Sequence, residues 1–392
     1  MKITSELMSR GLAEFTAGRI QEASILFREV LDSEPRNGQA LIHLAVISKG
    51  SGGVPAAIEL VKGILQSDPL FGEATALLVS LLRPLNRLEE ALPYLRAGIA
   101  LSSDPTPAVL LEVSLLLELN RVEEAVARLR ETLLQFPAAF LLNERLARLL
   151  SANQRHEEAL VCLRRAVELR PTVASVLCDF GSGLDCVGRQ TEALDCFATA
   201  VHLEPDSYVA LHLLGTGLFE KKEYAAAIEA FQKALQINPA SLHTLNNLGL
   251  ALVKTAQFQE GIEILKFVVN HQPAWSAAWL HLSIALREVG EIPASLEASR
   301  EALSLSPDSS ETLLQRSACL LRAGYSSEAA ECLWKAHQFD PTNAEIHSDF
   351  LFASNYLPGL SPANRFANYR QFSILHEETA RAAQKEIGRA HV

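Results

Sequence analysis

Polar side chains recur at a fixed interval in the second half of this 392-residue sequence. Asp179 and Asn247 stand 68 residues apart, and polar residues then follow every 34 residues, at His281, Gln315 and Asp349. Amide and imidazole groups both donate and accept hydrogen bonds, so a row of them could hold the N–H and C=O groups of an extended peptide. The spacing therefore predicts that these groups occupy equivalent places in a repeated element.

Sequence patterns of catalysis and metal binding do not accompany these residues. The chain has no HExxH, GxSxG or phosphate-loop motif. Its six cysteines show no CxxC spacing, and Cys162, Cys196 and Cys332 are related by multiples of 34. We therefore expect reduced packing thiols, no metal site and no disulfide. An enzyme acting from within the repetitive part of the chain is the function class that the sequence favours least.

The composition is that of an acidic helical protein. Hydrophobic residues make up 48% and aromatic residues only 6%, and the formal net charge is −11. Alanine and leucine dominate and favour helices, whereas an acidic balance disfavours binding to nucleic-acid phosphates. The longest uncharged stretch, 267–286, contains His271 and Pro273, which argues against a membrane helix, and the charged start does not resemble a signal peptide. We expect a cytoplasmic protein that binds neither nucleic acid nor membrane.

Prolines define an internal period of 34 residues. A proline fits just past the end of a helix, where its missing N–H costs little and the helix cannot continue. Every gap in the series is 34 residues or twice that, and nine prolines share it: 35, 69, 137, 171, 205, 239, 273, 307 and 341. The period predicts ten helical hairpins.

Small residues recur within the same frame. When the proline is counted as position 32, position 8 includes Gly215 and Gly249, and position 20 includes Ala193, Ala227 and Gly261. Two helix axes approach closely only where no large side chain intervenes. Positions 8 and 20 are therefore predicted to form the crossing point of each helix pair, with a large apolar residue at position 24 beside it.

This pattern resembles the tetratricopeptide repeat. The resemblance covers residues 4–343 as ten repeats and implies an all-α fold, a right-handed α-solenoid superhelix, with a C-terminal capping helix in the segment 344–385. It also implies that first helices line a concave groove and bind an extended peptide or acceptor protein through positions 2, 5, 6, 9 and 12. The polar residues at those positions are Asp179, His212, His243, Asn246, Asn247, His281, Arg287, Gln315 and Asp349. Because these side chains are expected to be exposed, replacing Asn246 and Asn247 by alanine is expected to cost little stability.

The segment 346–376 resembles a known junction. In bacterial O-linked N-acetylglucosamine transferase-like proteins, this junction leads from the tetratricopeptide array into a glycosyltransferase domain. The residues that carry the resemblance are His347-Ser348, Leu351-Phe352, Asn355-Tyr356, Pro358, Leu360-Ser361-Pro362, Phe366, Arg370 and His376. The residues that depart from the family's pattern are Asp349, Ser354, Leu357, Gly359 and Tyr369. The resemblance implies a parent protein that transfers sugar from UDP-N-acetylglucosamine to Ser or Thr hydroxyls. This chain carries no catalytic residue of that domain and needs no cofactor itself. In the junction, Pro358 and Pro362 are predicted to end the capping helix, and Ser361 to cap a helix that follows.

Two interpretations of the whole chain stay open. The first is a non-catalytic scaffold that serves a glycosyltransferase, and the alternative is a free-standing adaptor or assembly scaffold with no associated enzyme. Residues 386–392, EIGRAHV, match the translation of a common sequencing adapter and are interpreted as a non-native tail. The expected partners are proteins or extended peptides, and whether the chain forms a homo-oligomer stays open.

Overall fold

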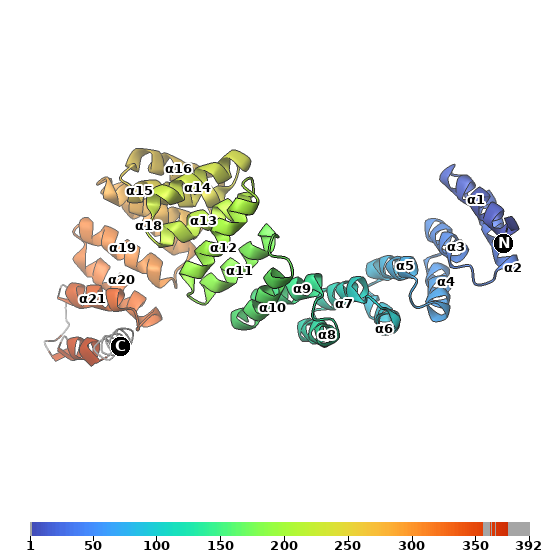
Figure 1. Cartoon of the computed structure of the whole chain (residues 1–392). Helices are drawn as coiled ribbons and strands as arrows, with labels where there is room; N and C mark the ends of the chain where they lie inside the picture. The colour runs from blue at the N-terminus through green and yellow to red at the C-terminus, as the bar shows by residue number, and fades with distance from the viewer. Residues whose placement is uncertain (1, 356–360, 362, 365, 375–392) are drawn as a thin grey trace. The chain divides into compact units, whose positions relative to one another are not determined.

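The computed structural model describes residues 2–355, 361, 363–364 and 366–374, which form two compact units, Met1–Arg189 and Gln190–Val392 (Figure 1). Within this part of the chain every regular element is a helix. The boundary between the units falls between the two helices of the sixth predicted repeat. The predicted roles of Pro358 and Pro362 and the adapter-like tail 386–392 lie outside the described residues, as do residues 356–360, 362, 365 and 375–376 of the junction.

The first unit contains five helix pairs and the first helix of a sixth. Its α-helices are α1 (Lys2–Thr16), α2 (Ile20–Ser33), α3 (Gly38–Gly50), α4 (Val54–Ser67), α5 (Gly72–Leu82), α6 (Leu92–Leu101), α7 (Thr106–Glu118), α8 (Val122–Gln135), α9 (Phe140–Ala152), α10 (His156–Leu169) and α11 (Ala174–Cys186).

The second unit begins with the second helix of the sixth repeat and continues with four further pairs and a capping helix. Its α-helices are α12 (Gln190–Leu203), α13 (Tyr208–Glu220), α14 (Tyr224–Ile237), α15 (Leu242–Lys254), α16 (Phe258–His271), α17 (Ser276–Glu288), α18 (Ile292–Leu305), α19 (Ser310–Arg322), α20 (Ser326–Phe339) and α21 (Ala344–Ser354). The predicted all-α array of paired helices is therefore confirmed, including the cap.

Small residues lie where the two helices of a pair cross, as the sequence predicts. A Cβ atom added to Gly261 of α16 would lie 2.8 Å from the carbonyl oxygen of Gly249 on α15. In the next pair, the hydroxyl of Ser295 on α18 donates to the carbonyl oxygen of Ser283 on α17 at 2.9 Å, and both side chains are fully buried. At Gly249 and Gly261 the two backbones approach so closely that even a methyl group would displace one of them, whereas the next crossing accommodates two serines.

Large apolar residues fill the space beside each crossing. Phe231 of α14 is fully buried, and its ring edge lies where a Cβ on Gly215 would stand, at 2.6 Å. Phe27 of α2 occupies the same place against Gly11 of α1. Position 24 is therefore the knob that packs against the small position 8, and the pair forms one apolar core between its helices.

A residue with positive φ follows the first helix of every repeat, and the sequence analysis does not predict it. The ten residues with positive φ in the described part of the chain stand 34 apart: Gly18, Gly52, Asn86, Asn120, Gln154, Gly188, Lys222, Ala256, Gly290 and Gly324. Glycine adopts this conformation without strain, whereas Gln154, Lys222 and Ala256 adopt it at a cost of roughly 1 kcal/mol each. The tight turn into the second helix requires this geometry regardless of residue type.

The third repeat departs from the regular pattern. Two 3-10 helices, Arg83–Leu85 and Leu88–Ala91, separate α5 from α6, and Pro84 and Pro93 each stand in the first turn of a helical segment. A proline is tolerated there because the N–H groups of a first turn have no partner within the helix. The second helix of this repeat is accordingly shortened to Leu92–Leu101.

Overfilling one crossing tests this packing. Ala227 of α14 is fully buried at position 20, and Ala226 beside it is exposed. Ala227→Leu should lower the free energy of unfolding by about 1–3 kcal/mol, because the larger side chain has no space at the crossing. Ala226→Leu should change it by less than about 0.5 kcal/mol. Urea unfolding of both variants measures the difference, and equal stabilities would place the crossing elsewhere.

Candidate functional site

The polar residues predicted to bind a peptide lie on first helices, and eight of the nine belong to the second unit. Adjacent first helices of that unit contact each other, α13 with α15, α15 with α17 and α17 with α19. We call their shared surface, which carries Asn247, Arg287 and Gln315, the first-helix face. Asp179 is the exception, because it lies on α11 in the first unit and forms an ion pair with Arg148 at 2.8 Å.

A chain of hydrogen bonds links α13, α15 and α17 along this face. The side-chain amide of Asn247 donates to the hydroxyl of Thr216 at 3.5 Å, and that of Asn246 donates to Asn247 Oδ1 at 3.4 Å. Nδ1 of His281 lies 3.0 Å from Asn246 Oδ1, a carbonyl-type oxygen, so the imidazole donates there. The polar side chains of three successive repeats therefore bind one another.

Asn246 is not the exposed amide that the sequence leads us to expect. Only 2% of its surface is accessible, and its oxygen is occupied by His281. The expected exposure of its side chain is accordingly wrong, and its removal is now expected to lower stability. Asn246, at position 5, faces the neighbouring helix α17, whereas Asn247, at position 6, is half-buried at the surface.

His212 and His243 also differ in exposure: His212 is half-buried and His243 is exposed. Nδ1 of His212 lies 2.9 Å from the hydroxyl of Thr244, which also meets Tyr208 and Ser241 at 3.0 Å. Burial lowers the pKa of His212, with a smaller effect from His243, so its ring is neutral at neutral pH. This cluster joins α13 to α15. His243 is exposed, with its ring against that of Trp275 at 4.6 Å.

Further along the face the polar groups remain accessible. The guanidinium of Arg287 donates to Gln315 Oε1 at 3.0 Å and to Glu288 at 3.1 Å, and both Arg287 and Gln315 are half-buried. Asp349 on the capping helix α21 is exposed, and desolvation, with a smaller contribution from Glu345, raises the pKa of its carboxyl. Arg287, Gln315 and Asp349 thus have accessible groups that can form further hydrogen bonds.

One buried charge escaped the sequence reasoning. Glu112 of α7 has no accessible surface, and each of its carboxylate oxygens is held by a guanidinium, from Arg96 at 2.7 Å and from Arg128 at 2.9 Å. The neighbouring repeats carry Leu78 and Leu146 at this position. A carboxylate at a position that is apolar in the repeats on either side is therefore the sequence feature that could have predicted it. Oε1 accepts a hydrogen bond from Arg96, whereas Oε2 makes only the ion pair with Arg128. Glu112 thus joins α6, α7 and α8.

The first unit also carries ion pairs from each repeat to the next. Lys62 contacts Glu90 at 2.9 Å, and the same pairing across 28 residues joins Arg96 to Glu124 and Arg130 to Glu158. Hydrogen bonds from Arg87 and then Lys62 lower the pKa of Glu90 to about 2. These contacts position neighbouring repeats, and Arg96 also reaches the first helix α7 through Glu112.

Other kinds of site find little support in the described part of the chain. No group of three or more His, Cys, Asp and Glu side chains is placed to hold a metal ion there. All six cysteines are free thiols, and burial raises the pKa of Cys162, Cys196 and Cys332. Among the described residues, no helix is both long and apolar enough to span a bilayer.

Comparisons with known proteins agree with this architecture. Family models described as tetratricopeptide repeat and TPR repeat match residues 110–174 and 217–255. A tetratricopeptide repeat protein from Parabacteroides merdae superposes with a TM-score of 0.55 at 16% identity, covering 63% of this chain and 98% of that one. The fold is that of a tetratricopeptide repeat array.

Other solved structures share the helical arrangement more loosely. Yeast Tom70 gives a TM-score of 0.49 at 15% identity, covering 100% of this chain and 96% of its own. YrrB, described as a TPR protein with an unusual peptide-binding site, gives 0.36 at 20% identity, covering 48% of this chain and 96% of its own. No curated protein sequence matches the chain significantly.

Removing the buried amide tests its structural role. Asn246→Ala should lower the free energy of unfolding by about 1–3 kcal/mol, because it leaves the donor of His281 without its acceptor in a buried place. Asn247→Ala is the matched control and should cost less than about 1 kcal/mol, since its hydrogen bonds are long. Equal losses in urea unfolding would contradict the assignment of Asn246 to the interior.

Acid should weaken the same contact. Burial, with a smaller effect from Lys254, lowers the pKa of His281 to about 4, whereas an unfolded histidine titrates near 6.5. Between these values the unfolded chain binds the additional proton, so the stability that depends on neutral His281 is complete above about pH 6.5 and declines as pH falls toward about 4. Urea unfolding at about pH 7.5 and about pH 5 should show a smaller decline for His281→Gln than for the natural chain. An identical decline would show that His281 does not titrate with unfolding.

Proposed function

We propose that the chain is a protein-interaction scaffold whose first-helix face in the second unit holds an extended peptide segment of a partner. The observation that carries the proposal is that some hydrogen-bonding groups on that face remain accessible to a partner. Arg287 and Gln315 lie on α17 and α19, which contact each other, and Asn247 lies on the preceding first helix α15. These groups offer donors and acceptors at successive repeats.

The chemistry of these groups suits a peptide backbone. An amide side chain donates through nitrogen and accepts through oxygen, so Asn247 and Gln315 can each bind a backbone C=O and N–H. Arg287 adds further N–H donors, which fit a carbonyl or a carboxylate of the partner. The buried Asn246 and the half-buried His281 hold the adjacent helices in register, so the surface groups are positioned before the peptide arrives.

The proposal predicts which substitutions weaken binding. Peptides selected on the natural chain from a random phage-displayed library should bind Asn247→Ala/Gln315→Ala more weakly by about 1–3 kcal/mol, since one or two hydrogen bonds disappear. The control pair, Gln232→Ala/Asn270→Ala, removes the same side-chain types from exposed positions on the second helices α14 and α16. Its affinity in isothermal titration calorimetry should equal that of the natural chain. If the first-helix pair binds as tightly as the control, the peptide docks elsewhere.

A finer proposal concerns the partner. The junction resemblance supports a scaffold that presents acceptor proteins to a glycosyltransferase domain using UDP-N-acetylglucosamine. Within the junction, the hydroxyl of Ser361 accepts a hydrogen bond from the N–H of Asn364 at 3.2 Å, as its predicted capping role requires. The family models match tetratricopeptide repeats, and the link to a transferase rests on the sequence resemblance. The free-standing adaptor is the competing proposal, and a cytoplasmic location is proposed for both.

Gene sequence distinguishes these two proposals. If the scaffold serves a transferase, the reading frame beyond the codon for Lys385 should encode a glycosyltransferase domain. A stop codon at that place, or a domain of another kind, would select the free-standing adaptor. Neither outcome bears on peptide binding by the first-helix face, which the affinity measurements test separately.

A further inference from the structure

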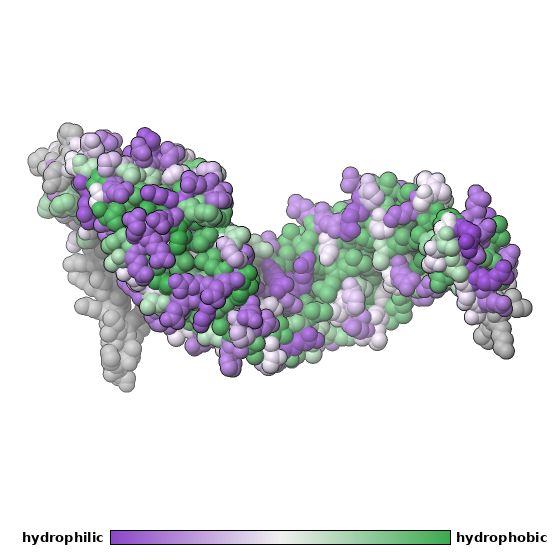
Figure 2. All heavy atoms as spheres, turned by 90° about the horizontal axis from the view of Figure 1, so that it is seen from above, coloured by the Kyte–Doolittle hydropathy of each residue, from purple (hydrophilic) through white to green (hydrophobic). Residues whose placement is uncertain are grey.

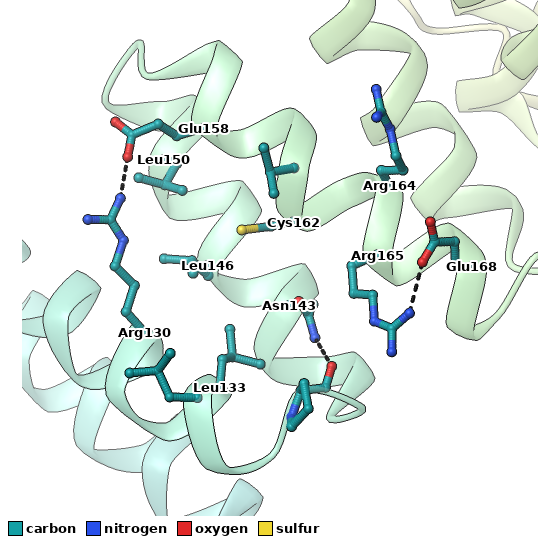
Figure 3. Close-up of a pocket in the computed structure, with 13 residues that line it drawn as sticks. Arg130, Leu133, Asn143, Leu146, Leu150, Glu158, Cys162, Arg164, Arg165 and Glu168 are labelled. Atoms are coloured by element: carbon teal, nitrogen blue, oxygen red, sulfur yellow. Dashed lines mark hydrogen bonds and ion pairs between the residues drawn. The ribbon is translucent and has the colours of Figure 1, made fainter.

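An apolar hollow lies on the second-helix side of the first unit. It has a volume of about 820 Å³ and is walled by α8 and α10, with α9 beneath them (Figure 3). Its apolar lining includes Leu133 of α8 and Leu146 and Leu150 of α9. All of these residues belong to the first compact unit, so the hollow is separate from the first-helix face of the second unit.

Two apolar side chains that line this hollow are almost entirely in water. Leu134 of α8 is 85% exposed and Val161 of α10 is 70% exposed. Charged and polar residues cover much of the surface visible in Figure 2, with apolar areas between them. Isolated exposed apolar residues are ordinary, whereas exposed ones beside an apolar depression mark a surface that another molecule covers.

The other repeats place polar residues where these two apolar side chains stand. Val161 is at position 22, where the repeats of the second unit carry a carboxylate: Asp195, Glu229, Glu263, Glu297 and Glu331. Leu134 is at position 29, where the six repeats that follow carry Glu168, His202, Gln236, Asn270, Ser304 and Gln338. The apolar surface is therefore a feature of the fourth and fifth repeats and not of the repeat pattern.

The rim of the hollow carries one cation that no carboxylate neutralises. Three of the four arginines on α8 and α10 form ion pairs, and Arg164 is exposed and forms none within the described residues. On the same rim Arg130 pairs with Glu158, and Arg165 pairs with Glu168 at 2.9 Å (Figure 3). The three arginines and two glutamates that line the hollow thus leave it with a net positive charge.

The segment around the hollow is basic, although the chain as a whole is acidic. Residues 121–170 contain nine arginines, no lysine and seven glutamates, which gives a formal charge of +2 in a chain of −11. This asymmetry favours an acidic partner at the hollow over a basic one. It also disfavours a two-fold contact between copies, which would bring two positively charged rims together.

The lining offers little to an extended peptide backbone. Asn143, the amide in the lining, is buried and already donates to the carbonyl oxygens of Pro137 at 3.3 Å and Ala139 at 3.0 Å. An α-helix satisfies its own backbone groups and needs only an apolar groove for its apolar stripe. A groove between two helices with a third as its floor is a surface on which amphipathic helices dock.

We propose that this hollow docks an amphipathic helix of another protein, one whose apolar stripe is flanked by a carboxylate. The stripe lies between Leu134 and Val161, and the carboxylate meets the guanidinium of Arg164, with which it can form two hydrogen bonds. The site uses α8, α9 and α10 and leaves the first helices of the second unit free. It gives the scaffold a second partner surface, with a chemistry different from that of the first.

Selection from a phage-displayed library of amphipathic helices tests the proposal. Helices are selected on the natural chain in the presence of excess Val161→Glu/Arg164→Glu protein, which removes those that dock elsewhere. The recovered helices should carry apolar residues three and four positions apart, with Asp or Glu beside them more often than Lys or Arg. Recovery of no helix, or of helices enriched in basic residues, overturns the proposal.

Matched substitutions in two repeats locate the contact. Val161→Gln and Arg164→Glu should each raise the dissociation constant of a selected helix at least about tenfold in isothermal titration calorimetry. Ile25→Gln and Arg28→Glu change the same positions, 22 and 25, in the first repeat, where both residues are exposed and lie outside the hollow. They should leave the constant unchanged. Equal constants for the two pairs of variants would contradict the assigned site, and circular dichroism checks that all four stay helical.

A charge exchange reports on Arg164 itself. Replacing the acidic residue of the selected helix by lysine should weaken its binding to the natural chain about tenfold and restore its binding to Arg164→Glu. A lysine helix that binds both proteins equally overturns the proposed pairing.

Two further measurements separate this site from other contacts. Asn247→Ala/Gln315→Ala should bind the selected helix as tightly as the natural chain does, and a loss would place the helix on the first-helix face and overturn the proposal. Light scattering should show the same protein mass with and without the helix, apart from the mass of the helix. A natural chain that is dimeric and becomes monomeric when the helix binds would assign the hollow to a second copy, which also overturns it.

Discussion

The close crossing of the two helices in each repeat is the constraint on which the rest of the structure depends. At Gly249 and Gly261 no side chain separates the backbones, and at Ser283 and Ser295 a hydroxyl bonds directly across the gap. Because the helices meet at a fixed point along their lengths, the side that each first helix turns toward its neighbours is also fixed. The placement of Asn246, Asn247 and His281 follows from that geometry.

The two units hold successive repeats together in different ways. In the first unit, second helices carry ion pairs from one repeat to the next, such as Lys62 with Glu90, and Glu112 is buried between two arginines. In the second unit, first helices are joined by neutral hydrogen bonds through Asn246 and His281. Exposed ion pairs weaken with added salt, whereas a buried neutral imidazole contact weakens with acid. One repeat pattern thus supports two kinds of coupling between neighbours.

Sequence reasoning succeeded where a residue type has one physical explanation. A proline every 34 residues, with small residues at two fixed positions, leaves few alternatives to paired helices, and the structure contains those pairs. The left-handed turn residues were missed because half of them, Lys222 and Ala256 among them, are not glycine. In those repeats the packing of two helices overrides the preference of the residue in the turn.

The site was harder to predict for a different reason. Positions 5 and 6 are adjacent on a helix, and their exposure depends on side chains one repeat away. Asn246 is buried because His281, 35 residues later, lies against it. A periodic pattern therefore identifies the first-helix face, and neighbouring repeats decide which of its residues remain accessible.

An extended peptide held by the first-helix face is the central claim of this account. Site-specific photo-crosslinking tests it most directly, with p-benzoylphenylalanine placed either at Gln315 on α19 or at the exposed Glu297 on the second helix α18. A peptide selected on the natural chain should become covalently attached to the protein labelled at position 315 and not to the protein labelled at 297. Attachment at 297 without attachment at 315 would place the peptide on the second helices and contradict the account.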